Sequence, residues 1–247
     1  MSARQAHRGP HPEDRDLFAA DAWPRLQRAV AELSWLLSRG YAMPSSIKLV
    51  GDRHRLNRRQ RVAVQRSACS DQARQRRTAH HVAPAALAGQ PLLIDGFNLI
   101  TTVEAALAGG VLLRGRDTAV RDMASMHGSY RKVTQTRPAL ELIGEALAVW
   151  RPGPARWLLD SPVSNSRRLA GLVHEVAQAQ AWPWQALTVV DPDRLLGDSD
   201  DVVISSDSVV LDRCPRWFNL VAAMLATGAV EARVVELNVS ASAEACP

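Results

Sequence analysis

The pattern of apolar positions divides the chain into a helical first third and a longer second part with a different periodicity. A first helix is predicted from Asp21 to Gly40, because apolar residues recur there at intervals of three and four, at Leu26, Val30, Leu33 and Leu37. A second helix is predicted from Asn57 to Ala68, where Asn57 and Gln60 have the spacing of a capping box. The first third is therefore expected to be all helical.

Short, nearly continuous apolar runs alternate with helical stretches in the rest of the chain. The runs predict five strands buried on both faces, at residues 92–94, 157–159, 187–190, 202–204 and 234–237. The stretches between them predict helices at 98–108, 116–131, 138–150, 165–180 and 215–227. Alternation of this kind predicts an α/β fold in three layers, with a central parallel sheet and right-handed crossovers.

Charge and composition predict the same division into domains. We expect a disordered tail at 1–14, a basic helical domain at 15–82, a linker at 83–90, an α/β domain at 91–238 and a tail at 239–247. Residues 1–82 hold 16 Lys and Arg against 7 Asp and Glu, whereas residues 83–247 hold 14 against 18, and the total is +5. A basic module beside an acidic one suggests a partner that is a polyanion and a separate site for cations. The alternative is a compositional bias toward arginine.

Composition also excludes several classes of protein. The three cysteines are widely spaced, with no CxxC pair, so neither a disulfide framework nor a cysteine zinc site is predicted. The N-terminal residues lack an apolar stretch, and no uncharged apolar run approaches the roughly 20 residues that span a bilayer. We therefore expect a soluble cytoplasmic protein with no membrane partner.

Carboxylates follow several of the predicted strands. Asp95, Asp160 and Asp191 come after the first three, and Asp207 lies just past the fourth. If the strand order is 3-2-1-4-5, then Asp95, Asp160 and Asp207 meet where the strand order reverses, the usual ligand site of such sheets. Clustered carboxylates repel unless a cation bridges them, and all-oxygen sites suit Mg²⁺ or Mn²⁺. The alternative is that each aspartate only caps the following helix.

The segment Asp95-Gly96-Phe97-Asn98 resembles the opening motif of the PIN/NYN superfamily of metal-dependent nucleases. The resemblance covers residues 91–238 and implies that Asp95 binds the metal and Asn98 steadies the site. The segment 204–208 is similar to that superfamily's fourth-strand element, which makes Asp207 a metal ligand and Asp212 a further acid. The superfamily also has an acid on an intervening helix, for which Glu104 and Asp122 both qualify.

The whole chain also resembles an uncharacterised prokaryotic family, a domain of unknown function. Members of that family join segments like 36–41 and 50–56 of this chain to a domain that opens with an Ile-Asp-Gly-Phe-Asn motif. This resemblance implies no activity.

Two further segments contain candidate ligand-binding residues. Ser164 and Asn165 precede a predicted helix, where they could hold a phosphate or merely cap the helix. Residues 52–77 hold nine arginines, of which one helical face carries Arg55, Arg58, Arg59 and Arg66. Arginine binds phosphate through paired N–H groups, so this face could follow a nucleic-acid backbone. It could equally be a solvated charged face, and the stretch has no aromatic residue for base stacking.

The leading hypothesis is a nuclease dependent on Mg²⁺ or Mn²⁺, an endoribonuclease that cleaves RNA with a metal-activated water. Asp95, Asp160 and Asp207 would hold the metal, assisted by Asn98 and by the further acids Asp122 and Asp212. The alternatives are a PIN-like module that binds RNA or a partner without catalysis, and a small-molecule phosphohydrolase. Against the last, the sequence has no glycine-rich phosphate loop. Substrate specificity and oligomeric state are not predicted.

Overall fold

The computed structural model describes residues 9–123, 130 and 133–238, which form two compact units. Unit 1 contains residue 9 and the described residues of 80–110 and 124–232, and unit 2 contains 10–79, 111–123 and the described residues from 233 onward. The chain passes from one unit to the other after residues 9, 79, 110, 123 and 232. These units differ from the continuous domains 15–82 and 91–238 that the sequence predicts, because the segments 111–123 and 233–238 pack in unit 2.

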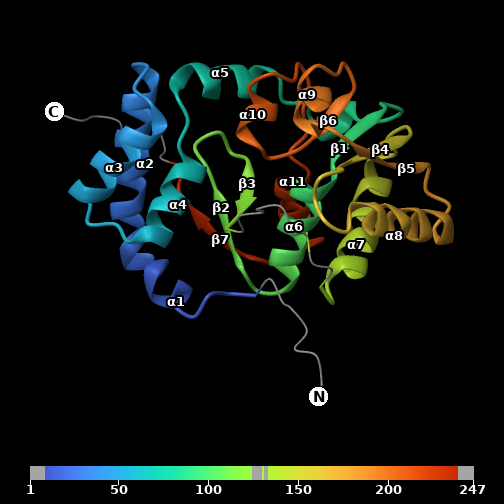
Figure 1. The fold of residues 1–247 in the computed structure, drawn as a ribbon, viewed down its shortest axis with the longest axis horizontal. Helices are drawn as coiled ribbons and strands as arrows, with labels where there is room; N and C mark the ends of the chain where they lie inside the picture. The colour runs from blue at the N-terminus through green and yellow to red at the C-terminus, as the bar shows by residue number, and fades with distance from the viewer. Residues whose placement is uncertain (1–8, 124–129, 131–132, 239–247) are drawn as a thin grey trace. The chain divides into compact units, whose positions relative to one another are not determined.

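Unit 1 is built on a parallel sheet with the strand order β5-β4-β1-β6 (Figure 1). Its strands are β1 (Leu92–Asp95), β4 (Ala155–Asp160), β5 (Trp184–Val189) and β6 (Val202–Ile204). They correspond to the first four predicted strands, in the order 3-2-1-4. The fifth predicted strand lies in a different sheet, so the predicted order 3-2-1-4-5 is wrong.

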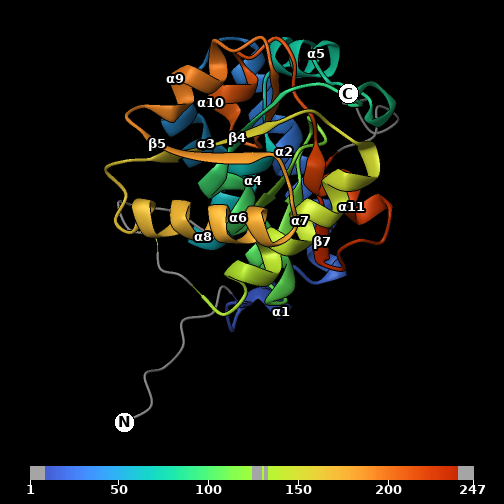
Figure 2. The same cartoon turned by 90° about the vertical axis from the view of Figure 1, so that its right-hand side faces the viewer.

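The helices of unit 1 lie on both sides of this sheet. They are α6 (Gly96–Leu107), α7 (Thr136–Trp150), α8 (Ser166–Ala179), α9 (Pro192–Gly197), α10 (Ser208–Leu211) and α11 (Leu220–Ala226), with a short 3-10 turn at Pro84–Ala86. Figure 2 shows α7 and α8 on one side of β4 and β5, and α9 and α10 on the other. Every residue of β1 and β6 is buried, as expected of central strands covered on both faces. The helix predicted at 215–227 begins only at Leu220.

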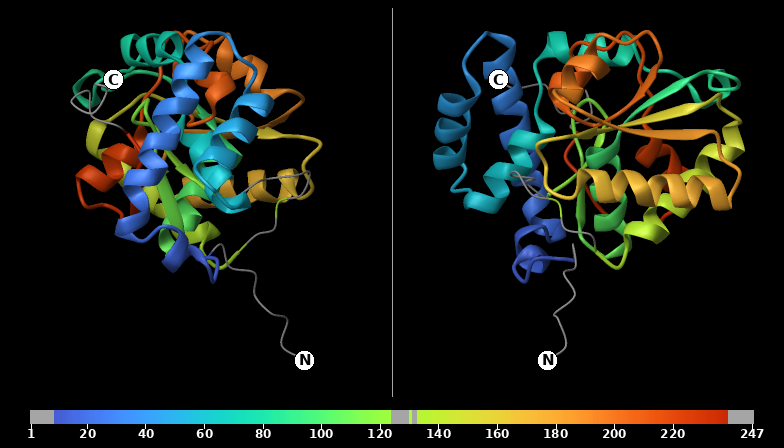
Figure 3. Two further views of the ribbon diagram at one scale, coloured as in Figure 1. Left: turned by 90° about the vertical axis from the view of Figure 1, so that its left-hand side faces the viewer. Right: turned by 45° about the vertical axis from the view of Figure 1, so that its right-hand side comes forward.

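Unit 2 combines the N-terminal helices with a small sheet from two distant parts of the chain. The helices are α1 (Asp14–Leu17), α2 (Trp23–Ser38), α3 (Met43–Arg53), α4 (Arg58–Ser67) and α5 (Asp71–Ala79), with a 3-10 turn at Ala20–Ala22. The strands β2 (Val111–Arg114), β3 (Val120–Asp122) and β7 (Arg233–Glu236) have the order β3-β2-β7. Helices α2, α3 and α4 pack against one another (Figure 3). Their apolar faces share a core with Val111, Leu113 and Val235 of the sheet.

One prediction about secondary structure needs correction here. The predicted helix 116–131 is absent in its first half, where β3 forms an antiparallel pair with β2. Residues 124–129 and 131–132, residues 1–8 of the predicted tail 1–14, and the predicted tail at 239–247 lie outside the described residues. The predicted helical domain 15–82 also contains helix α5. The capping box of Asn57 and Gln60 is confirmed, since each side chain accepts a hydrogen bond from the other residue's backbone N–H.

A buried ion-pair cluster joins α5 to the β2–β3 connection in unit 2. The carboxylate of Asp117 accepts hydrogen bonds from Arg77 Nη1 at 2.5 Å and from Arg121 Nη1 and Nη2 at 2.9 and 2.6 Å. All three residues are buried. Burial alone would raise the pKa of Asp117, but the two guanidinium groups outweigh it and lower the pKa to about 2. This segment of unit 2 is therefore held by charges as well as by apolar packing.

In the part of the chain that the structure describes, no helix combines the length and apolar character that crossing a bilayer requires.

Candidate functional site

The carboxyl ends of three neighbouring strands in unit 1 carry aspartates. Strands β4, β1 and β6 are parallel and adjacent, and Asp160 and Asp95 are the last residues of β4 and β1. Asp207 lies three residues beyond the end of β6 and is the N-cap of α10. The three aspartates therefore lie at the same edge of the sheet, the edge at which ligands of open parallel sheets bind.

Asp95 is the most perturbed carboxyl group at this edge. Its side chain is 8% exposed, its Oδ2 accepts a hydrogen bond from Ser205 Oγ at 2.7 Å, and its Oδ1 accepts one from the backbone N–H of Asn98 at 3.4 Å. Burial raises the pKa of Asp95 to about 7, and the charges of Asp207 and Asp193 add to this rise, while the two hydrogen bonds oppose it. The fold therefore places a carboxyl group where its ionised form is costly.

Asn98 and the serines after β6 fix the relative positions of the two strand ends. Asn98 Oδ1 accepts hydrogen bonds from both the backbone N–H and the hydroxyl of Ser206, each at 2.9 Å. Ser205 Oγ, which donates to Asp95, also accepts from the backbone N–H of Asp207 at 3.0 Å. The carboxyl groups of Asp95 and Asp207 are thus connected through one hydroxyl and one backbone amide.

A fourth aspartate that the sequence did not single out, Asp193, belongs to the same edge. It lies on α9 directly after β5, and burial followed by the charges of Asp207, Asp191 and Asp160 raises its pKa. Since Asp193 in turn raises the pKa of Asp95, these acids repel one another across the edge. The signal in the sequence was the Asp-Pro-Asp segment at 191–193, whose second aspartate falls in the first turn of a helix that begins at the strand end. We call Asp95, Asp160, Asp193 and Asp207 the acidic edge.

Helix capping and membership of the acidic edge are not exclusive. Asp95 and Asp207 accept backbone N–H groups at the starts of α6 and α10, so both also act as caps. Asp191, which follows strand β5, caps α9 by accepting the N–H of Arg194 at 3.2 Å.

The acidic edge has the chemistry but not the closed geometry of a metal site. Its donors are all carboxylate oxygens, the ligands that Mg²⁺ and Mn²⁺ prefer. Among the described residues, however, no three His, Cys, Asp or Glu side chains are grouped so that they could hold a metal ion. Mg²⁺ keeps several waters and is commonly bound by one or two carboxylates together with substrate phosphates, so the residues fit such an open site.

The two candidates for a helix-borne acid have different surroundings. Glu104 lies on α6 and is fully buried, and its Oε1 accepts hydrogen bonds from Tyr130 and Thr136, both at 2.5 Å. Asp122 lies on strand β3 of unit 2 rather than on a helix, 3.8 Å from Arg66, so its prediction as the helix-borne acid is wrong. Asp212, the proposed extra acid, is half-buried at the end of α10.

The predicted phosphate-binding turn before α8 has a different arrangement. Asn165 is the residue before α8, but its backbone is left-handed and its side chain donates to the carbonyl of Tyr130 at 2.9 Å instead of capping the helix. Ser164 is exposed. Ser166 fixes the turn, because its hydroxyl donates to the carbonyl of Asp160 at 2.5 Å.

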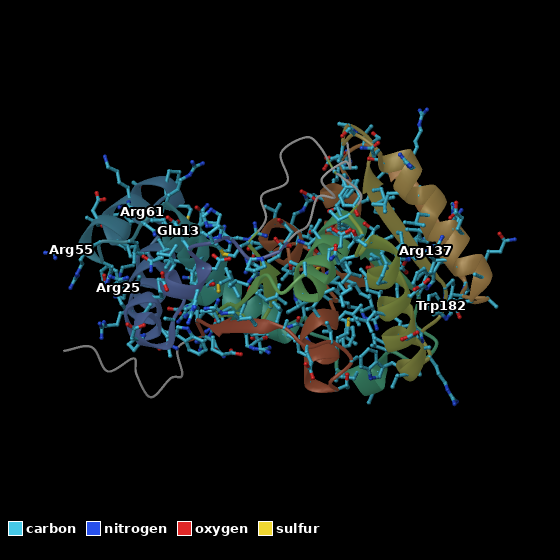
Figure 4. The ribbon with its side chains drawn as sticks, turned by 90° about the horizontal axis from the view of Figure 1, so that it is seen from below. Glu13, Arg25, Arg55, Arg61, Arg137 and Trp182 are labelled. Atoms are coloured by element: carbon cyan, nitrogen blue, oxygen red, sulfur yellow. The ribbon has the colours of Figure 1, made fainter. Side chains whose placement is uncertain are left out.

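The predicted arginine face of unit 2 is divided into paired and exposed members. Arg59 pairs with the buried carboxylate of Asp14 through two nitrogens, and Arg66 lies 3.8 Å from Asp122. Arg58 is exposed on α4, and Arg55 precedes that helix with a left-handed backbone. Figure 4 shows the Arg55 side chain pointing away from the neighbouring helices. Of the four arginines, Arg59 and Arg66 therefore have acidic partners within unit 2, whereas Arg55 and Arg58 are exposed.

Comparison with known proteins finds families without an assigned function. The family described as "Domain of unknown function (DUF5616)" matches residues 84–223, and the one described as "Protein of unknown function (DUF434)" matches residues 25–80. The chain is 25% identical over 186 residues to "Uncharacterized protein MJ0935" of Methanocaldococcus jannaschii, an alignment that covers 75% of this chain and 88% of the relative. No solved structure matches the chain.

Proposed function

The chain belongs to the DUF5616 family, a domain of unknown function, and from the residues at the acidic edge we propose that it is a nuclease that hydrolyses phosphodiester bonds in RNA with a divalent cation. The observation that carries the proposal is the environment of Asp95. Burial and the charges of Asp207 and Asp193 raise its pKa to about 7, at the edge of a parallel sheet where ligands bind. The PIN/NYN resemblance of the segments 95–98 and 204–208 supports the same assignment.

A bound cation would balance the negative charge of the acidic edge. Bound by Asp95 and Asp207, with Asp160 and Asp193 near enough to interact with them, Mg²⁺ or Mn²⁺ would lower the pKa of a water and neutralise charge on the phosphate. Repulsion between carboxylates, which disfavours the ionised form of Asp95, would turn into attraction for the ion.

The residues around Asp95 prepare the carboxylates for this role. The hydroxyl of Ser205 orients the Asp95 carboxyl group, and the pair of hydrogen bonds from Ser206 to Asn98 holds the segment after β6 against the start of α6. Groups held in this way need little rearrangement when a ligand binds, which is how protein sites gain affinity and rate.

The basic character of unit 2 supports RNA as the substrate. Arg55 and Arg58 are exposed and form no ion pair with other described residues, so both remain free to contact phosphates in a sequence-independent manner.

The test is a cleavage assay on single-stranded RNA and DNA, with Mn²⁺ or with EDTA. We expect metal-dependent cleavage of RNA that Asp95→Asn abolishes. Asp200→Asn is the matched control, because Asp200 is an exposed aspartate at the opposite, amino end of β6 and should leave cleavage intact. A parallel melting experiment should show that Mn²⁺ raises the Tm of the wild type but not of Asp95→Asn, since an ion bound only to the folded state stabilises it.

Two outcomes would overturn the proposal in different ways. RNA binding without cleavage under any metal condition would favour the non-catalytic binding module. Hydrolysis of small phosphate esters without any action on polynucleotides would favour the phosphohydrolase.

A further inference from the structure

Unit 2 exposes two aromatic rings at one end of helix α2. Trp35 is 53% exposed and Tyr41 is 58% exposed, although both residue types usually bury most of their surface. Trp35 lies in the last turn of α2, and Tyr41 lies in the turn that follows the helix. Burial in the folded core accounts for neither ring.

The end of α2 holds these rings in a defined backbone geometry. Gly40 has a φ of +82°, its N–H donates to the carbonyl of Leu37 at 3.0 Å, and the N–H of Tyr41 donates to the carbonyl of Leu36 at 3.2 Å. This pair of bonds is the Schellman motif, which requires the left-handed conformation that glycine adopts most easily. The backbone of Tyr41, six residues after Trp35, is therefore fixed by hydrogen bonds to the end of α2 rather than carried on a loose loop.

A guanidinium group already stacks on one of the rings. Arg39 Cζ lies 3.6 Å from the centroid of the Trp35 ring, and Arg39 Nη1 donates to the carbonyl of Trp35 at 3.2 Å. The hydrogen bond explains Arg39 as a partner of the helix C-terminus. It does not explain why more than half of the Trp35 surface remains open to solvent beside a flat cation.

The charges around the rings favour an anionic partner. The acids of α2, α3 and α5 each have an arginine partner within unit 2: Glu32 pairs with Arg53 at 3.7 Å, Asp52 with Arg61 at 2.7 Å and Asp71 with Arg116 at 2.6 Å. On α3, the helix that follows Tyr41 and packs on α2, Lys48 is exposed. Arg39 and Lys48 therefore give this surface a net positive charge.

We propose that Trp35, Arg39 and Tyr41, with Lys48 of the neighbouring helix α3, form a docking surface for single-stranded nucleic acid, in which bases stack on the two rings and the cations contact phosphates. Aromatic and guanidinium planes are the groups on which unpaired bases stack, and stacking tolerates any base sequence. A double helix keeps its bases stacked on one another and offers no face to these rings. This inference deepens the proposed function and rests on it for the choice of RNA over DNA.

The test measures binding by fluorescence anisotropy in EDTA, which prevents metal-dependent cleavage. The probes are a labelled ten-nucleotide RNA, a DNA of the same sequence, and an abasic strand of equal length and charge. Trp35→Leu and Tyr41→Leu keep apolar side chains but remove the rings. Each should weaken binding of the base-bearing strands about fivefold to a hundredfold, the range for loss of one stacked base.

The abasic strand and two control variants separate stacking from charge. Neither leucine variant should change affinity for the abasic strand, and Trp35→Phe should restore most of the affinity lost in Trp35→Leu. Arg39→Gln should weaken binding of all three strands, whereas Arg28→Gln, an equal charge change at an exposed position of α2 nearly three turns earlier, should have little effect.

Three results would overturn the proposal. The first is that the leucine variants lose equal affinity for the base-bearing and the abasic strands. The second is that binding is unchanged in both leucine variants. The third is that no strand binds and that the protein instead self-associates in a manner that Trp35→Leu removes. Binding with ring dependence but no cleavage in Mn²⁺ would support this surface and refute the nuclease. Cleavage that is independent of both rings would support the nuclease and overturn the surface.

Discussion

Asp95 illustrates how a single side chain can lower the stability of a fold and still be suited to function. Its pKa of about 7 lies well above the ordinary value of 3.8, so at pH 5 the folded state retains a proton that the unfolded state has lost. The contribution of Asp95 to the free energy of unfolding therefore falls as the pH rises from about 4 to about 7. Above that range the carboxylate is ionised and its burial destabilises the folded state to the full extent. A bound cation would remove that cost.

Replacement of Asp95 by asparagine should change how stability depends on pH. We expect the free energy of unfolding of Asp95→Asn, measured in urea with EDTA, to gain on the wild type between pH 4 and pH 8. The upper limit of this gain is about 4 kcal/mol, from a shift of about three pH units at about 1.4 kcal/mol each. If the free energy of unfolding depends on pH in the same way in the wild type and in Asp95→Asn, the prediction is contradicted.

Gly96 is a second residue whose identity is set by its neighbours. A Cβ at this position would lie 2.6 Å from Leu159 Cδ2 and 2.9 Å from the backbone oxygen of Leu158. Gly96→Ala should therefore destabilise the protein by about 1–3 kcal/mol, because β4 cannot move away without disturbing the sheet. Gly171→Ala is the control: Gly171 lies at an exposed position of α8, nothing lies within 4 Å of an added Cβ, and the substitution should stabilise the protein by about 0.5–1 kcal/mol. Thermal melts of both variants test this prediction, and equal changes in Tm for Gly96→Ala and Gly171→Ala would contradict it.

Local chemistry at the strand ends could be predicted from the sequence only where it depends on near neighbours. Asp95, Asp160 and Asp207 each follow an apolar run, so their place at one edge follows from the parallel sheet. The partners of Arg59 and Arg66 are 45 and 56 positions away, at Asp14 and Asp122, and no periodicity reports such pairs.

At the level of elements, the buried cluster around Asp117 connects α5 to the β2–β3 connection. Its carboxylate is ionised well below the ordinary range, so this contribution to stability is present above about pH 4 and is lost as the pH falls through about 2. Removing the central charge leaves Arg77 and Arg121 buried without their shared counter-ion.

Asp117→Asn should be among the most damaging single substitutions in unit 2. Loss of one partner from a buried ion pair typically costs about 3–5 kcal/mol, because the remaining charge is left uncompensated. Asp52→Asn is a matched control, since Asp52 is exposed and its pair with Arg61 contributes little. Urea unfolding at pH 7 measures both, and a loss below about 1 kcal/mol for Asp117→Asn would contradict the assignment.

The helices α2 and α4 and the strands of the unit 1 sheet were predictable because their signals are local. Apolar spacing, the capping box at Asn57 and continuous apolar runs each act within one element. Strands β2 and β3 were missed because they lie beside and within the stretch 116–131, whose polar residues have helical spacing; β1 and β6 are equally short and were predicted. Strand β7 was recognised, but its partner β2 lies more than a hundred residues away, and only tertiary packing determines that pairing.

At the level of the whole molecule, the continuous segment 91–238 does not coincide with either compact unit, and we expect that it does not fold alone. It contains Val111, Leu113 and Val235, whose apolar neighbours on α2 and α4 belong to the first 82 residues. The isolated segment should therefore expose these side chains and aggregate or remain partly unfolded.

Size-exclusion chromatography and amide hydrogen exchange of the fragment 91–238 test this expectation. Strands β2 and β7 should exchange rapidly in the fragment and slowly in the full chain, and coexpression with residues 1–90 should restore their protection. A monomeric fragment with protected β2 and β7 amides would show that the interleaved units are not required for folding.

The repeated passage of the chain between the two units also determines when the parts of unit 2 are made during synthesis. Helices α2 and α4 are made early, but β7, which completes their sheet, ends only at Glu236. At about 5–20 residues per second, translation from residue 80 to residue 236 takes on the order of 10–30 s, during which the nascent helices carry an incomplete apolar face. We therefore expect the nascent chain to need shielding of that apolar face until β7 has emerged from the ribosome.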